Sequence, residues 1–131
     1  MMKKIVAFAG SLLIAGLFSS IAFAQGSGAG RFRGFEEQGG EALYKGICQG
    51  CHMPNAQGAV GAGMYPALAK NPKLEVAGYP IAVVVNGQKA MPAFGSMLSD
   101  QQIADVINYV RTHFGNNYKD AVKPADVKAA R

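Results

Sequence analysis

The stretch Cys48-Gln49-Gly50-Cys51-His52 decides how this 131-residue chain is interpreted, because it holds both cysteines of the sequence. On a helix, two thiols three positions apart lie about one turn apart on the same face. Each thiol can then form a thioether to one of the two vinyl groups of a haem, and the next residue, a histidine, lies where its imidazole can coordinate the iron. The spacing therefore predicts covalent attachment of a c-type haem.

Three other chemistries use closely spaced cysteines. A thioredoxin-like redox pair follows a strand in an alternating βαβ pattern, which this sequence lacks. A zinc site needs further ligands, and the other histidine, His113, lies far along the chain on a predicted helix. A plain structural disulfide in an exported protein needs only the two cysteines. An export signal favours haem over these alternatives, because bacteria attach haem covalently outside the cytoplasm.

Residues 1–24 have the pattern of such a signal. Lys3 and Lys4 form a short basic start, and an apolar stretch follows over residues 5–20. The small residues of Ala22-Phe23-Ala24 then predict cleavage after Ala24. An uncleaved membrane anchor is the alternative, since the stretch is just long enough to span a bilayer. The cleavage triplet and the interrupting glycines favour removal and a periplasmic mature protein, with no later membrane span.

Composition limits the function classes. The length fits one small domain and excludes a multidomain enzyme. The net charge of +5 includes two lysines of the predicted signal, so it falls to +3 on processing. That charge is too small and too scattered for a dedicated nucleic-acid binder. With 17 glycines and no tryptophan, the chain has little side-chain area for a core, and a bound apolar cofactor would supply it.

Four segments follow from the pattern. After the signal we expect a flexible leader over 25–35, a haem domain over 36–115, and a tail over 116–131 whose structure the sequence leaves open. The haem domain opens with a helix predicted from 35 or 36 to about 49, firm from residue 41, and a loop over 53–73 follows it. Residues 76–86 are ambiguous between strand and helix. A last helix begins after Ser99 as N-cap, with Gln102 completing a capping box, and ends at Gly115.

The other axial position of the iron is filled in electron carriers by methionine or a second histidine, and is open in haem enzymes and sensors. The two methionines of the signal leave with it. Met53 adjoins His52 and cannot reach round the ring, and Met64 follows that histidine by only 12 residues. Met91 lies in a proline-containing loop before the last helix, and this context makes it the predicted ligand.

Two alternatives to Met91 remain open. Met97 lies two residues before the N-cap of the last helix, where we expect it to be drawn into helix packing. His113 is predicted to lie on the helix itself. A methionine is also a common filler of apolar cores, so position and loop context, rather than residue type, support the prediction.

Beyond these residues, the sequence resembles the class I cytochromes c, small monohaem electron carriers, over roughly residues 37–115. Gly40 and Tyr44 match the glycine and aromatic of the family's N-terminal helix, and the Cys-x-x-Cys-His stretch matches its haem motif. The resemblance implies an all-α fold whose N- and C-terminal helices cross, with loops wrapped round one haem. Tyr109 is then expected to meet Gly40 at the crossing.

Two loops carry the resemblance further. Tyr65-Pro66-Ala67-Leu68 resembles the family's Gly-Pro-x-Leu loop, which implies that the Pro66 carbonyl accepts the ring N–H of His52 and that Leu68 packs on the haem. Tyr65 stands where the family often has glycine, which leaves the backbone path before the proline open. Met91-Pro92-Ala93-Phe94 resembles the Met-Pro-x-Phe ligand loop and adds Phe94 to the haem contacts.

The function implied is periplasmic one-electron transfer rather than catalysis, with a dehydrogenase, a terminal oxidase or another cytochrome as redox partner. A permanent cytochrome subunit of one dehydrogenase is the main alternative. A haem enzyme or gas sensor with an open sixth site and a thiol oxidoreductase are the others. Lysines are expected to ring the haem edge and guide an acidic partner: Lys45, Lys70, Lys73 and Lys89. Apolar side chains are expected to bury the haem: Leu43, Ile47, Leu68, Phe94, Met97 and Ile107.

Overall fold

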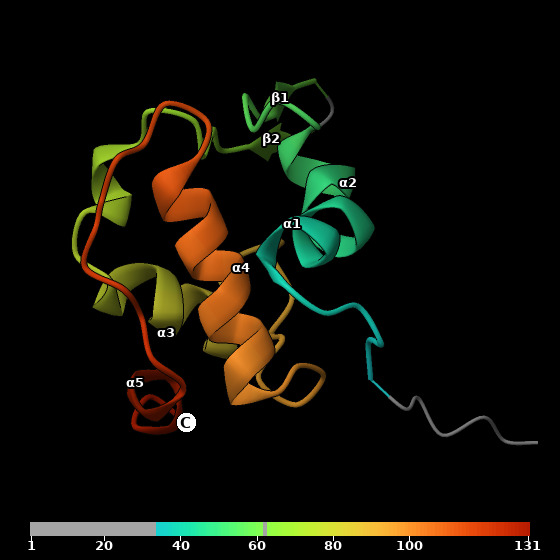
Figure 1. Cartoon of the computed structure of the whole chain (residues 1–131). Helices are drawn as coiled ribbons and strands as arrows, with labels where there is room; N and C mark the ends of the chain where they lie inside the picture. Colours follow the sequence, from blue (N-terminus) through green and yellow to red (C-terminus); the bar gives the residue numbers. More distant parts are fainter. Residues whose placement is uncertain (1–33, 62) are drawn as a thin grey trace, which may run out of the picture. The chain divides into compact units, whose positions relative to one another are not determined.

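The computed structural model describes residues 34–61 and 63–131, so the predicted export signal and nearly all of the leader lie outside the described residues. The described part is mostly helical, as the predicted all-α cytochrome fold requires (Figure 1). Its elements run in the following order: α1 (Gly40–Leu43), the π-helical η1 (Tyr44–Cys48), α2 (Gln49–His52), β1 (Ala59–Val60), β2 (Met64–Tyr65), the 3-10 turn η2 (Pro72–Leu74), α3 (Gly78–Asn86), α4 (Asp100–Thr112) and α5 (Pro124–Lys128).

The first helical run begins at Gly40 and continues through η1 and α2 to His52. The observed start agrees with the prediction that the helix is firm from residue 41, whereas the outer start at residue 35 or 36 and the end near residue 49 are corrected. Gly39 has φ 82 and ψ 150, a backbone conformation that no helix contains, so residues 34–38 lie outside the helix. At the other end Met53 has φ 67, which turns the chain sharply away directly after His52.

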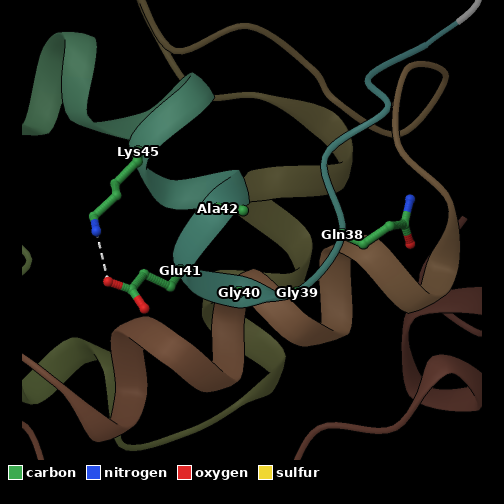
Figure 2. Close-up of a pocket in the computed structure, with 6 residues that line it drawn as sticks. All are labelled: Gln38, Gly39, Gly40, Glu41, Ala42 and Lys45. Atoms are coloured by element: carbon green, nitrogen blue, oxygen red, sulfur yellow. Dashed lines mark hydrogen bonds and ion pairs between the residues drawn. The ribbon is translucent and has the colours of Figure 1, made fainter.

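The crossing of α1 and α4 depends on Gly40, as the resemblance implied (Figure 2). A Cβ atom built on Gly40 would lie 2.3 Å from the Asp105 carbonyl oxygen and 2.5 Å from the Tyr109 Cβ. Only glycine therefore permits this approach of the two helices. Next to the crossing, the Tyr44 ring packs at centroid distances of 5.8 Å from Tyr109 and 4.8 Å from Phe114.

The ambiguous segment after residue 76 is a helix, α3. Pro80 lies in its first turn, where a missing N–H costs no helical hydrogen bond, and Gly87 ends it with φ 73. Ile81 and Val85 are buried on one side of α3. The β-branched residues that suggested a strand are overruled by this packing, because tertiary contacts outweigh intrinsic propensity.

Helix α4 is the longest of the described elements and follows its prediction closely. Ser99 accepts the Gln102 N–H and the Gln102 side chain accepts the Ser99 N–H, so the predicted capping box is confirmed. Its apolar face is buried at Ile103, Val106, Ile107 and Val110. The helix ends at Thr112 rather than at Gly115, because His113 is extended. The only strands among the described residues form a short antiparallel pair, β1 with β2.

Burial of Tyr44 makes the stability of the fold sensitive to alkaline pH. Its side chain is 1 % exposed, and its hydroxyl donates to the Met53 carbonyl oxygen at 2.7 Å. Desolvation, helped by the nearby Cys48 and Tyr109, raises the pKa of Tyr44 from 10.0 to about 12. Between those values the unfolded chain has lost the phenolic proton while the folded chain keeps it, so stability falls as pH rises.

We therefore expect the free energy of unfolding to fall by up to about 1.4 kcal/mol per pH unit from this group above pH 10, and Tyr44→Phe to remove that component. Denaturant titrations at a series of pH values measure the slope. Tyr65→Phe is the matched control, because Tyr65 is 39 % exposed. Equal slopes for wild type and Tyr44→Phe would contradict the expectation.

Candidate haem site

A cavity of about 690 Å³ lies between the helices and the loops that join them. Apolar side chains form most of its wall, contributed by η1, α3, α4 and the connecting loops. These apolar lining residues are Ile47, Pro66, Leu68, Leu74, Pro80, Val83, Val84, Pro92, Phe94, Val106, Ile107 and Val110. Such a wall around a few polar groups is typical of a cofactor site.

Four of the apolar side chains predicted to bury the cofactor line this cavity: Ile47, Leu68, Phe94 and Ile107. Leu43 and Met97 do not, and this part of the prediction is wrong. Leu43 is fully buried in the core, where α1 packs on α4. The α3 residues Val83 and Val84 were missed because the segment was not assigned as a helix. A helical assignment would have given α3 a second apolar face beside the one formed by Ile81 and Val85.

His52 is 9 % exposed and borders the cavity at the end of α2. Its Nδ1 lies 2.9 Å from the Pro66 carbonyl oxygen, the contact that the resemblance implied. A carbonyl only accepts, so Nδ1 carries the proton and donates it, which leaves the Nε2 lone pair free to coordinate a metal. The hydrogen bond also fixes the orientation of the ring.

The Pro66 loop is held against the turn that follows His52. The Ala56 carbonyl oxygen accepts the N–H groups of Leu68 and Ala69 at 2.8 and 2.9 Å. Gly58, with φ 66, approaches so closely that an added Cβ would lie 2.1 Å from the Tyr65 carbonyl oxygen. The close approach of the chain before Pro66, which the sequence left open at Tyr65, is therefore permitted by a different glycine, Gly58, just before β1.

Met91 lines the cavity from a loop that is pinned on both sides. Its N–H and carbonyl exchange hydrogen bonds with Gln88 at 2.9 and 3.0 Å, which closes a tight turn. Three residues on, the Phe94 N–H donates to the Val84 carbonyl oxygen of α3 at 2.9 Å. A loop tied in this way presents its methionine to the cavity with little conformational freedom.

The other candidate ligands of the haem iron either do not line the cavity or are largely exposed. Met97 and Met53 do not line the cavity, and neither does His113, whose Nδ1 lies 2.8 Å from the Tyr109 carbonyl oxygen and whose ring stacks on Tyr109. Met64 does line it, but its side chain is 79 % exposed on β2. The geometry thus favours Met91 over each of them.

Cys48 and Cys51 are free thiols beside His52 on the cavity wall, the first half-buried and the second exposed. Burial, with a smaller contribution from Cys51, raises the pKa of the Cys48 thiol to about 11. Reactive redox cysteines have lowered pKa values instead, and no strand leads into η1 or α2. This arrangement disfavours a thiol oxidoreductase. Over residues 34–61 and 63–131, no group of three or more His, Cys, Asp or Glu side chains can hold a metal ion, which disfavours zinc.

The polar part of the wall is basic. Of the four lysines predicted at the edge, Lys73 and Lys89 line the cavity. Lys45 instead pairs with Glu41 at 2.6 Å beside a shallow pocket at the start of α1 (Figure 2), and the Lys70 side chain lies against Gly115. A buried arginine, Arg111, also lines the cavity and was missed, because a basic residue in a helix gives no sign of burial.

These residues fit a haem in three respects. The apolar wall suits the porphyrin faces, and the basic side chains of Lys73 and Lys89 suit the two carboxylates of its propionates. The two thiols and His52 lie together on one wall, as covalent attachment and axial coordination require. No helix of the described residues is long and apolar enough to cross a membrane.

Comparison with known proteins agrees with this fit. The family model described as "Cytochrome C oxidase, cbb3-type, subunit III" matches residues 36–110. The gluconate 2-dehydrogenase cytochrome c subunit of Pantoea cypripedii is 33 % identical over 112 residues, which is 76 % of this chain and 25 % of that protein. The alcohol dehydrogenase (quinone) cytochrome c subunit of Gluconobacter oxydans is 33 % identical over 112 residues, 76 % of this chain and 23 % of its own.

Cytochrome c6 of Bumilleriopsis filiformis is a shorter relative, 37 % identical over 78 residues, which is 56 % of this chain and 86 % of that protein. The chain therefore spans about a quarter of the dehydrogenase subunits that it matches, whereas its match covers most of this small cytochrome.

Proposed function

Because the chain belongs to the cytochrome c family described as cytochrome c oxidase, cbb3-type, subunit III, we propose that it is a periplasmic one-electron carrier with one c-type haem. Cys48 and Cys51 would attach the haem covalently. His52 and Met91 would be its axial ligands, with Pro66, Leu68 and Phe94 in contact with it. The observation that carries this proposal is the grouping of both thiols, His52 and Met91 around one apolar cavity.

When bound, the haem supplies a one-electron couple between ferric and ferrous iron. The chain's own residues set the properties of that couple. The Pro66 carbonyl holds the proton on His52 Nδ1 and so raises the basicity of the coordinating nitrogen. The Met91 thioether is a soft ligand that favours the reduced state and raises the potential. The apolar wall excludes water from both ligands.

Electron exchange would take place at the side of the cavity near Cys51, which is exposed. Apolar side chains are exposed on the β1–β2 hairpin and around the start of α3: Val60, Met64, Tyr65, Val76 and Tyr79. Lys73 and Lys89 lie on the cavity wall with Met64 and Tyr65. This combination suits brief contact with an acidic redox protein, because apolar contact gives affinity while charge steers the approach.

The partner proposed is a periplasmic dehydrogenase, since relatives are named as cytochrome subunits of gluconate and alcohol dehydrogenases. A permanent subunit of one such enzyme is the second candidate, supported by the same names. Size-exclusion chromatography of a native extract separates the two, because a free carrier elutes as a small protein and a subunit co-elutes with dehydrogenase activity.

A potentiometric titration of purified protein tests the electron-carrier proposal itself. We expect a single one-electron wave and low-spin spectra in both oxidation states. Carbon monoxide should bind the ferrous protein only slowly, because His52 and Met91 would both have to hold the iron under this proposal. A high-spin ferric spectrum with ready binding of carbon monoxide or cyanide would contradict the proposal and favour an enzyme or gas sensor.

A further inference from the structure

Residues 111–131 lie beyond the part of the chain that the family model matches, yet they are packed against the haem domain. Val122 and Val127 are buried, the latter completely, and α5 packs on α4 and α3 (Figure 1). Asn108 and Val122 exchange two hydrogen bonds at 2.8 and 2.9 Å. The segment that the sequence left open is therefore anchored firmly along α4.

A second anchor lies about one turn further along α4, near the C-terminal end of the helix. Arg111 is fully buried, and its guanidinium donates to the Leu74 and Glu75 carbonyl oxygens at 2.8 and 2.9 Å. The same group donates to the Asp120 carboxylate at 2.7 Å and to the Asp120 carbonyl oxygen. Because Arg111 and Val122 are buried, the residues that follow them, including Arg131, have a fixed place on the domain.

From this position, the Arg131 side chain contacts the segment that follows Met91. Its guanidinium donates to the Gly95 carbonyl oxygen, to the Leu98 carbonyl oxygen at 2.9 Å and to the Asp100 carboxylate at 2.5 Å. The three acceptors span the end of the methionine loop and the first turn of α4. A planar guanidinium is the side chain that can serve three such acceptors at once.

The opposite side of the same loop is bound to α3. The Phe94 and Gly95 N–H groups donate to the Val84 and Val85 carbonyl oxygens at 2.9 and 3.1 Å. In this loop, backbone N–H groups therefore donate to α3, and backbone carbonyl groups accept from Arg131. Met91 precedes this doubly held segment by only three residues, so the position of its sulfur depends on both attachments.

We propose that Arg131 is a positioning residue for Met91: it clamps the loop between α3 and the segment that follows α5, and so resists dissociation of the methionine sulfur from the iron. The proposal rests on the proposed function, in which Met91 is an axial ligand. It assigns a role to the C-terminal segment, which the family match does not include.

Arg131→Met tests the clamp, with Lys128→Met as the matched control, because Lys128 is exposed on α5 and takes no part in the clamp. Hydrogen exchange of the Gly95 and Leu98 amides reports loop opening without any assumption about the ligand. We expect exchange at these amides to rise about tenfold in Arg131→Met, with Ile107 in α4 unchanged. Lys128→Met should behave as wild type.

Imidazole competition provides the second readout, since imidazole binds ferric iron only when Met91 leaves. We expect Arg131→Met to bind imidazole about tenfold more tightly than wild type. Arg131→Lys keeps the positive charge but lacks the planar guanidinium that serves several acceptors, so its imidazole affinity should be intermediate. Unchanged exchange and imidazole affinity would overturn the proposal. An equal rise in exchange throughout α4 would overturn it too, because it would show general destabilisation. Failure of the proposed ligation is separately recognisable, because the wild-type protein would then lack a sulfur–iron band.

Discussion

Met91→Ala should abolish the sulfur-to-iron charge-transfer band of the ferric protein and lower its reduction potential. Met91 lines the cavity from a loop pinned to Gln88 and, through Phe94, to α3. If Met91 is a ligand, its loss would remove the soft thioether that stabilises ferrous iron, which favours the ferric state. Axial ligand identity spans about 0.8 V across haem proteins, so a fall on the order of 0.1 V or more is expected.

Two other methionines provide matched controls for this substitution. Met64→Ala removes the exposed methionine of the cavity wall, and Met97→Ala removes one that does not line it. Both variants should keep the band and a potential close to that of wild type, measured by absorption and potentiometric titration. If Met91→Ala kept the band while Met64→Ala or Met97→Ala lost it, the methionine whose substitution removes the band would be the ligand instead of Met91.

Gly40→Ala should strongly destabilise the fold, although it adds only one methyl group to α1. The added Cβ would lie 2.3 Å from the Asp105 carbonyl oxygen, a backbone atom that cannot turn aside as a side chain could. Overpacking usually costs about 1–3 kcal/mol, and here the two helices must separate, so we expect about 3 kcal/mol or more. Chemical denaturation of the haem-loaded protein measures the loss.

Gly78→Ala serves as the control for Gly40→Ala. Gly78 lies in a helix, and a Cβ built there meets nothing within 4 Å. Alanine should therefore leave stability unchanged or raise it by up to about 1 kcal/mol, through the lower entropy of the unfolded chain. If Gly40→Ala were as stable as Gly78→Ala, the two helices could move apart at the crossing at little cost, and the expectation would be wrong.

Much of the fold and site could be predicted because short-range rules decided it. The capping box at Ser99 and Gln102 depends on two residues three apart, and the apolar face of α4 on helical periodicity. The spacing of the Cys-x-x-Cys-His stretch predicts haem attachment from five consecutive residues. These features need no knowledge of distant parts of the chain, so the sequence contains all the information that they require.

Other features depend on tertiary contacts that no local pattern shows. The segment around Val83 is β-branched, yet it folds as a helix because it packs on α4 and the cavity. Leu43 points into the helix crossing rather than to the cavity, which only the packing of α1 decides. Arg111 and Arg131 are separated in sequence by many residues from most of their acceptors, so their roles became visible only in the structure.

The mass and the absorption spectra of protein exported in a host with a haem-attachment system show whether Cys48 and Cys51 attach a haem that His52 coordinates. We expect the mass of one covalently bound haem after denaturation, low-spin spectra, and loss of the covalent mass in the Cys48→Ser, Cys51→Ser double variant. Exported protein that carries no covalent haem, with an intact Cys48–Cys51 disulfide or thiol pair instead, would show that this chain does not attach haem.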